Sequence, residues 1–311
     1  MLLHCLSGLY QVAVALRHLA YDYRLLPVTR VPAVVISIGN IVAGGVGKTP
    51  LVHFLAELLS KKFQVAILSR GYKSKAEHRW EPARVHSSMD VHAVGDEPLW
   101  LAQKLPHVQV WVGKKRARSA QEAVKGGAEV IILDDGFQHR KLHRDFDVVI
   151  KSDMEPTHFL PRGTLRDHPS RLEKASLLVS MKHEKDSHVR FKREIATDLS
   201  GKKVAVFCAI ANPHRFIEQV EAAGGIIVAS QCKSDHMPFT VEEIESFYKE
   251  SGADCLICTE KDAIKLPSTA IPIIPIPLML SLAGGETLWQ TFIDKIHNQV
   301  DYVRRVSGRT P

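Results

Sequence analysis

The sequence predicts an α/β protein of two domains. Its 311 residues are about twice the length of a typical domain. From residue 33 onward, short runs rich in β-branched residues alternate with amphipathic stretches of helical period. The runs are apolar along their whole length, so each strand is expected to be buried on both faces. Such strands are typical of a parallel sheet with helices on both sides.

The first expected domain spans residues 1–183. We expect its strands at residues 34–38, 65–68, 108–112, 130–133, 148–150 and 177–180. We expect helices at residues 50–61, 96–105 and 114–125. This order of strands and helices predicts the large parallel sheet.

The second expected domain spans residues 184–311 and is smaller. The boundary is placed at the charge-dense segment 183–199, which has no strong apolar period. We expect strands at residues 204–209, 226–230, 255–259 and 271–277, and helices at 213–223, 240–251 and 286–306. Three prolines in segment 271–277 predict an edge strand or an irregular one.

Composition excludes several classes of protein. Apolar residues make up 45% of the chain and charged residues 24%, which is typical of a soluble globular protein and not of a disordered or fibrous one. No stretch is apolar for the roughly 18 residues that a membrane-spanning helix needs. The net charge of +7 fits an anionic partner, such as a phosphorylated substrate or an acidic lipid surface. No basic run resembles a nucleic-acid-binding arm, so we expect no nucleic-acid partner.

The five cysteines do not form a disulfide framework. Their number is odd and they are scattered through apolar segments, which indicates a reducing cytosol. Cys255 and Cys258 form a C-x-x-C pair within the apolar run Cys-Leu-Ile-Cys. Because there is no second pair at metal-binding spacing, a buried strand is favoured over zinc or redox chemistry.

The first 24 residues carry an apolar stripe of helical spacing. The stripe consists of Leu2, Leu6, Leu9, Ala13, Leu16, Ala20 and Tyr23. No basic region precedes it, so a secretory signal is not expected. Two interpretations remain open: a helix that lies in a membrane interface, or a helix that packs on its own domain. The pattern alone favours packing.

A glycine-rich loop follows the strand at 34–38 and precedes the helix at 50–61, where a phosphate-binding loop should lie. Its glycines let backbone N–H groups turn toward phosphate oxygens, and the helix N-terminus adds a positive dipole. Lys48 can reach the β and γ phosphates, and the Thr49 hydroxyl can hold Mg²⁺. Val42 stands where the usual pattern has glycine, so the loop is a variant. The candidate nucleotide-binding residues are Asn40, Gly44, Gly45, Val46, Gly47, Lys48 and Thr49.

Two carboxylates end the apolar run at 130–133. Asp134 or Asp135 can hold Mg²⁺, directly or through water, and so neutralise charge on a transferring phosphoryl group. An isolated Asp-Asp is often only a turn, but together with the loop it predicts a metal site. Asp96 at a helix start and His236 in a loop carry no functional argument by themselves.

Several segments together are similar to the tetraacyldisaccharide 4'-kinase family, the lipid A kinases of Gram-negative bacteria. They occur in the order of that family from residue 37 to residue 262. The matching segments are 37–40, 44–50, 68–72, 94–98, 134–140, 165–167, 209–213, 235–236 and 259–262. The Asp-Asp-Gly-Phe-Gln-His run that begins at Asp134 is rather specific.

The resemblance implies transfer of the ATP γ-phosphoryl group to the 4'-hydroxyl of a lipid A disaccharide 1-phosphate, which gives lipid IVA. It also implies two α/β/α sandwich domains, the first like P-loop NTPases, with the active site in the cleft between them. The enzyme is expected at the cytoplasmic face of the inner membrane. Because the substrate is a lipid, the resemblance favours peripheral membrane contact through the N-terminal helix.

The resemblance also implies roles for single residues. Asp96 matches the proposed general base, and His236 matches its partner. Asp167 stands where the family commonly has glutamate, and Arg162 replaces a small residue, so acceptor contacts there are expected to differ. The other matches are Arg116 and Arg166 near phosphates, and Tyr72 and Gln138 along the same site.

One alternative comes from another class of protein. The Gly-Gly-Val-Gly-Lys-Thr run also resembles the loop of partitioning-type ATPases, which carry a signature lysine just before the two glycines. Ala43 occupies that position here, which argues against them. A non-catalytic nucleotide-binding scaffold is a third interpretation, but it would leave Lys48 and Asp96 without a role.

Overall fold

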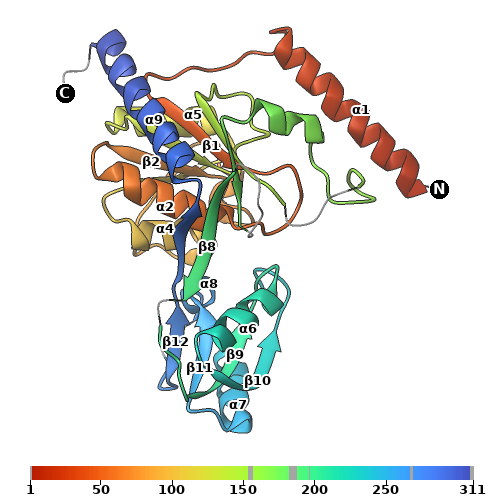
Figure 1. Ribbon diagram of the computed structural model, residues 1–311, viewed down its shortest axis with the longest axis vertical. Helices are drawn as coiled ribbons and strands as arrows, with labels where there is room; N and C mark the ends of the chain where they lie inside the picture. The colour runs from red at the N-terminus through yellow and green to blue at the C-terminus, as the bar shows by residue number, and fades with distance from the viewer. Residues whose placement is uncertain (1, 153–156, 182–187, 196, 267–268, 309–311) are drawn as a thin grey trace.

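The protein consists of two lobes (Figure 1). Residues of both lobes line one cavity. The computed structural model describes residues 2–152, 157–181, 188–195, 197–266 and 269–308. The large lobe contains a nine-stranded sheet, and the small lobe contains a four-stranded sheet.

The large sheet has the strand order β13-β8-β7-β6-β1-β5-β2-β4-β3. Most neighbours pair in parallel, but β3 with β4 and β13 with β8 are antiparallel. The strands are β1 (Val34–Gly39), β2 (Val65–Ser69), β3 (Ala83–Val85), β4 (Gln109–Val112), β5 (Val130–Asp134), β6 (Phe146–Ile150), β7 (Leu177–Ser180), β8 (Val189–Ile195) and β13 (Leu278–Gly284). The expected parallel sheet thus carries one antiparallel strand at each edge.

Helices cover both faces of this sheet. On one face, apolar residues of α2 (Lys48–Ser60), α4 (Asp96–Lys104) and α9 (Glu286–Ser307) join the main core. On the other face, α5 (Arg116–Lys125) packs through Ala120 and Ala123. A further short helix, α3 (Val91–Val94), leads into α4. The expected α/β/α sandwich is confirmed for the large lobe.

The small lobe is a second α/β/α sandwich built on a parallel sheet of order β10-β9-β11-β12. Phe216 of α6 packs on one face and Ile244 of α7 on the other. Its elements are β9 (Lys203–Cys208), α6 (Pro213–Ala222), β10 (Ile226–Cys232), α7 (Val241–Ser251), β11 (Cys255–Thr259), α8 (Glu260–Ala263) and β12 (Ile273–Ile276). Strand β12, which contains Pro275, lies at the sheet edge, as expected, and the C-x-x-C pair lies in β11.

The boundary expected between residues 183 and 184 does not separate the two sheets. β8 and β13, both beyond that boundary, belong to the large sheet, and α9 packs in its core. The small lobe is therefore an insertion between β8 and β13. The reason is long-range pairing. β8 pairs in parallel with β7, and β13, which follows the small lobe in the sequence, pairs antiparallel with β8.

The N-terminal helix α1 (Leu2–Asp22) turns its polar side toward the large lobe. The Ser7 hydroxyl donates to the carbonyl of Phe159 at 2.7 Å, and a ring nitrogen of His18 lies 2.7 Å from a carboxylate oxygen of Asp167. The leucines on the other side are exposed, so the expectation that the apolar stripe packs on its own domain is wrong. These exposed apolar residues include Leu6, Leu9, Val12, Leu16 and Leu19. Among the described residues, no helix is both long enough and apolar enough to cross a membrane.

Candidate active site

The glycine-rich loop connects β1 to the first turn of α2. Gly47 caps this helix in a left-handed conformation, with φ of +93°. A Cβ atom built on Gly47 would lie 1.8 Å from Nη2 of Arg193, which donates to the carbonyl of Val46 at 2.9 Å. Glycine is therefore required here both by the backbone conformation and by the approach of an arginine from β8.

Lys48 begins α2 and faces a carboxylate. Its Nζ lies 3.5 Å from Oδ1 of Asp135 and donates to Oδ1 of Asn40 at 3.3 Å. Arg166 donates to both carboxylate oxygens of Asp135, each at 2.9 Å. Burial acts to raise the pKa of Asp135, but the Arg166 hydrogen bonds and the charge of Lys48 lower it to about 2. The turn therefore carries a stable negative charge between two cations.

Asp134 is the more buried of the two neighbouring carboxylates. Its Oδ2 accepts from the Ser69 hydroxyl at 3.2 Å, and its carbonyl accepts from Arg116 at 3.2 Å. Burial, together with the charges of Glu97 and Asp135, raises the pKa of Asp134 to about 7. Burial also lowers the pKa of Arg116 to about 10.

The residues at this end of the cavity fit Mg²⁺. Mg²⁺ usually takes one or two carboxylates and completes its shell with phosphate oxygens and water. Asp134 supplies a buried carboxylate whose charge is unfavourable without a nearby cation, and Thr49 supplies a hydroxyl. No cluster of three or more His, Cys, Asp or Glu ligands occurs in the described ranges. The fit is thus to a metal held jointly with nucleotide phosphates.

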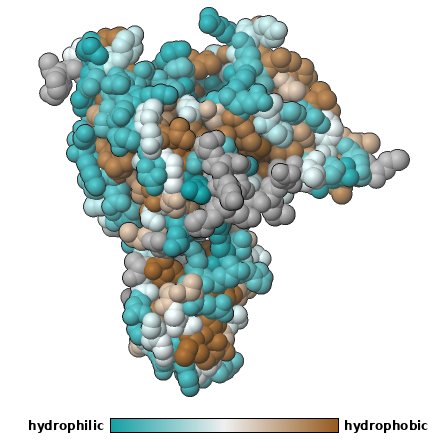
Figure 2. All heavy atoms as spheres, viewed as in Figure 1, coloured by the Kyte–Doolittle hydropathy of each residue, from teal (hydrophilic) through white to brown (hydrophobic). Residues whose placement is uncertain are grey.

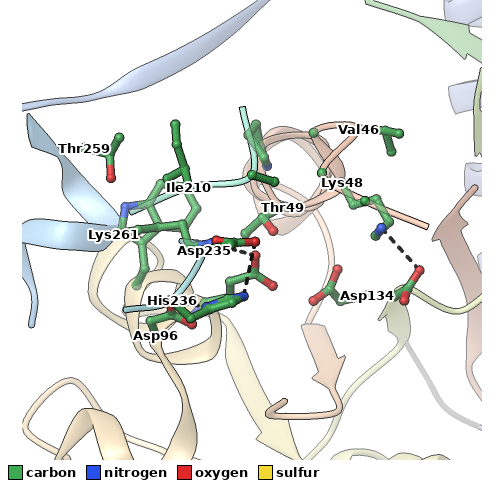
Figure 3. A pocket seen from close by; sticks show the side chains of 18 of the residues that line it. Val46, Lys48, Thr49, Asp96, Asp134, Ile210, Asp235, His236, Thr259 and Lys261 are labelled. Atoms are coloured by element: carbon green, nitrogen blue, oxygen red, sulfur yellow. Dashed lines mark hydrogen bonds and ion pairs between the residues drawn. The ribbon is translucent and has the colours of Figure 1, made fainter. Parts of the chain in front are cut away.

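The opposite side of the cavity carries a carboxylate–histidine pair. Nδ1 of His236, in the small lobe, lies 2.8 Å from Oδ2 of Asp96, at the start of α4 (Figure 3). Oδ1 of Asp96 accepts from the backbone N–H of Glu97 at 3.0 Å. His236 has φ of +69°, a conformation that costs a non-glycine residue about 1–3 kcal/mol and is often kept at functional sites.

The two members of this pair shift each other's pKa. Burial acts to raise the pKa of Asp96, but the hydrogen bond with His236 and the charges of Lys261 and Lys265 lower it well below its usual range. The same hydrogen bond raises the pKa of His236, although burial acts in the opposite direction. The pair therefore favours a carboxylate beside an imidazolium.

One cavity of about 600 Å³ joins the two sides. Its size falls within the range of small-molecule sites. The expected residues that line it come from both lobes: Gly44, Gly45, Val46, Gly47, Lys48, Thr49, Tyr72, Asp96, Arg116, Asp134, Asp135, Arg166 and His236.

Three expected site residues lie outside the cavity lining. Asn40 is fully buried and donates to the carbonyl of Val42, so it shapes the loop. Gln138 donates to the carbonyl of Asn40 at 2.9 Å. Asp167 has a side chain only 1% exposed and pairs with His18 of α1. In this structure, all three support the loop or α1.

Other lining residues were not expected from the sequence. Arg193 lies in the charge-dense segment 183–199 at which the domain boundary was placed, but the apolar Val189, Phe191 and Ile195 at every second or fourth position were a signal for a strand. Lys261 and Glu97 form an ion pair at 2.9 Å between the lobes. Both were within segments of the family resemblance, but nothing local indicated that they would meet.

Comparison with known proteins agrees with this geometry. A model of the tetraacyldisaccharide-1-phosphate 4'-kinase family matches residues 1–297. The tetraacyldisaccharide 4'-kinase of Anaeromyxobacter dehalogenans (strain 2CP-C) is 36% identical over 297 residues, which cover 83% of this chain and 79% of the relative. That of Chlamydia abortus is 34% identical over 305 residues, covering 86% and 83%.

A solved structure is also similar along nearly the whole chain. It is a crystal structure of LpxK from Aquifex aeolicus in complex with ATP. The two chains superpose with a TM-score of 0.77 at 30% identity, over 94% of this chain and 97% of the other. By its sequence and its fold, the chain belongs to the tetraacyldisaccharide 4'-kinase family.

Proposed function

We propose that the protein transfers the γ-phosphoryl group of ATP to the 4'-hydroxyl of a tetraacyldisaccharide 1-phosphate, in lipid A biosynthesis. The observation that carries this proposal is a single cavity in which a phosphate-binding loop faces a carboxylate–histidine pair. ATP is a reasonable donor because a similar chain has been solved with ATP bound.

The loop side would bind and orient the donor. Backbone N–H groups of the loop and the N-terminus of α2 attract phosphate oxygens. Lys48 lies beside the loop and can contact the β and γ phosphates. Arg116 and Arg166 are further cations of the same wall, suited to charge that develops on the leaving ADP. Mg²⁺, held by Thr49 and by Asp134 or Asp135, would supply further charge neutralisation there.

The side of the cavity that carries the Asp96–His236 pair, here called the dyad side, would bind and activate the acceptor. The 4'-hydroxyl oxygen forms the new bond to the γ phosphorus, the bond from that phosphorus to the β–γ bridging oxygen breaks, and ADP leaves. The hydroxyl proton passes to the Asp96 carboxylate, which His236 orients. A carboxylate of low pKa is a weak base, but the loose transition state of phosphoryl transfer depends mainly on positioning.

An assay with a defined acceptor tests this function. The purified protein would be incubated with labelled ATP, Mg²⁺ and detergent-solubilised tetraacyldisaccharide 1-phosphate, and the lipid analysed by mass spectrometry. We expect a bisphosphorylated product. A control acceptor methylated at the 4'-oxygen should gain no phosphate. Equal labelling of both acceptors, or of neither, would refute the proposed function.

We also propose that α1 lies on the membrane surface. Its exposed apolar side (Leu6, Leu9, Val12, Leu16 and Leu19) is visible in part in Figure 2 and has no protein cover among the described residues. The opposite side is tied to the active site, because the Tyr10 hydroxyl donates to the carbonyl of Arg166 at 3.2 Å. A lipid acceptor could therefore leave its chains in the bilayer while its sugar enters the cavity.

Vesicle binding tests the membrane contact. Leu9, which is 68% exposed, can be changed to aspartate without loss of internal packing. Leu9→Asp should reduce co-sedimentation with phosphatidylglycerol vesicles by about tenfold or more, since it replaces a leucine that would insert into the bilayer with a negative charge. Gln11→Asp adds the same charge at an exposed polar position and should bind nearly as the wild type does. Equal binding by all three proteins would place the membrane contact elsewhere.

A further inference from the structure

The short segment from Thr259 to Asp262 lies at the contact between the lobes. Thr259 caps α8, and its hydroxyl donates to Oδ2 of Asp262 at 2.7 Å. The same oxygen accepts from the backbone N–H of Ala209 at 3.2 Å. These hydrogen bonds fix α8 against the end of β9, so that Lys261 in α8 and Lys265 just after it lie beside the start of α4.

Lys265 follows α8 and is the lysine nearest to the dyad. Its side chain is only 10% exposed, and its Nζ lies 3.6 Å from Oδ2 of Asp96 and 3.1 Å from Oδ1 of Asp262. It makes no well-aligned hydrogen bond with any residue in the described part of the chain. A buried ammonium group costs free energy unless carboxylates compensate for it. Asp96 is one of the two carboxylates that do so here.

Lys261 of α8 pairs with Glu97, the residue that follows Asp96 in α4. Its Nζ lies 2.9 Å from Oε1 of Glu97, and the backbone N–H of Glu97 holds Oδ1 of Asp96. Figure 3 shows Lys261 on the same side of the cavity as Asp96 and His236. The small lobe thus presents two lysines and a histidine to the two acids at the start of α4.

We propose that Lys265 is a positioning residue, which holds the Asp96 carboxylate in its catalytic orientation when the lobes are together. This inference rests on the proposed function, because it concerns the base of the same reaction. With Oδ2 held by His236 and Lys265 from the small lobe, and Oδ1 by the backbone of α4, the carboxylate cannot rotate freely. Docking of the lobes and placement of the base then become one event.

The charged groups around Asp96 come from several elements. His236 and Lys265 face its Oδ2 directly, while Glu97 and Lys261 form the neighbouring ion pair. Asp235 lies 3.6 Å from the far ring nitrogen of His236. Lys265 takes part in neither the His236–Asp96 hydrogen bond nor the Glu97–Lys261 ion pair. A substitution of Lys265 is therefore expected to leave both in place.

A double-mutant cycle tests whether Lys265 acts through Asp96. Lys265→Met keeps the aliphatic stem and removes the charge, and we expect kcat to fall about 10- to 100-fold with the KM for ATP nearly unchanged. Lys265→Arg should recover most of the loss. In an Asp96→Asn background, Lys265→Met should lower kcat by less than about twofold, since the carboxylate it positions is already gone.

Lys104→Met is the matched control. Lys104 pairs with Glu260 across the same lobe contact but does not touch Asp96. We expect it to change kcat by less than about threefold in both backgrounds. If Lys265→Met costs the same factor with and without Asp96, or costs nothing, Lys265 does not position the base. If Lys104→Met is equally harmful, the lysines only hold the lobes together.

A thermal-unfolding cycle separates this inference from the assigned substrate. The loss of Tm caused by Lys265→Met should be clearly smaller in the Asp96→Asn background than in the wild type, whichever acceptor the enzyme uses. Equal losses of Tm would overturn the Lys265–Asp96 contact itself. A protein that shows coupling in Tm but no phosphorylation of the disaccharide would refute the proposed function and leave the contact standing.

Discussion

The two sides of the cavity are built in different ways. The loop side comes from neighbouring segments of the large lobe. These are the end of β1, the start of α2 and the end of β5, which pairs in parallel with β1. The dyad side joins α4 of the large lobe to a loop and a helix of the small lobe, with Asp96 and His236 140 residues apart. The first depends on local structure, whereas the second exists only when the lobes meet.

This difference predicts how each side of the cavity responds to substitutions. The phosphate-binding loop is held by hydrogen bonds from within the large lobe, among them those of Gln138 and Arg193, so its geometry should survive changes at the lobe contact. The dyad depends on ion pairs that reach across that contact. We therefore expect substitutions on the loop side to act alone, and those on the dyad side to be coupled.

The largest effect is expected at Lys48. Lys48→Ala removes the point charge beside the β and γ phosphates and should lower kcat by about 10³-fold or more. Tm should change little, because Lys48 is at the cavity surface. The exposed Lys62 near the end of α2 supplies a control, and Lys62→Ala should retain wild-type turnover. Near wild-type kcat for Lys48→Ala would disprove the assignment of a phosphate-binding loop.

The dyad should give smaller but coupled losses. Asp96→Ala removes the base and should lower kcat by about 10²–10⁴-fold with little change in ATP affinity. His236→Ala should cost less, because the carboxylate remains. Since the residues act as a unit, the double variant should lose far less than the product of the two single losses. Steady-state kinetics of the three variants would show independent residues if the losses multiply.

A pH-dependent stability difference should also belong to the dyad side. The hydrogen bond with Asp96 raises the pKa of His236 in the folded protein, against the effect of burial. In the unfolded chain histidine titrates near pH 6.5. The stabilisation by this pair is therefore full below about pH 6.5 and is lost as pH rises through the folded-state pKa.

Melting temperatures check this sign. His236→Gln should lower Tm by about 2–4 °C at pH 6 and by less at pH 9. The exposed His86 is a suitable control, and His86→Gln should have little effect at either pH. A Tm loss that grows with pH would mean that the histidine is neutral when it contacts Asp96.

Local patterns predicted most of the fold. Apolar runs located the central strands, and the glycine loop located the nucleotide end of the site. The β8–β13 end of the sheet could not be predicted in this way, because β8 (Val189–Ile195) mixes charged and apolar residues instead of forming an apolar run. The pairing of β13 with β8 in the large sheet joins segments far apart in the sequence, so no local pattern of residues predicts it.

The candidate site shows the same division. Lys48, Thr49 and Asp134 were predicted from the order of strand, loop and helix. Asp96 and His236 were identified only through the family resemblance, since an acid at a helix start is usually a cap. Nothing in the sequence indicated that Lys265, just after α8, would lie near Asp96, because that contact depends on how the two lobes pack.

Asp167 should give the smallest effect on turnover, because it supports α1 and does not line the cavity. Oδ1 of Asp167 pairs with His18 at 2.7 Å, and its Oδ2 makes no hydrogen bond with the described residues. Asp167→Asn keeps an acceptor for His18 but removes the charge, so we expect a loss of about 1–3 kcal/mol in unfolding free energy. We expect kcat to stay within about tenfold of the wild type. His18→Ala should reproduce both effects, and the double variant should add little to either single one. If Asp167→Asn instead raised the KM for the lipid acceptor while His18→Ala did not, Asp167 would contact substrate, and the loop side would extend beneath α1.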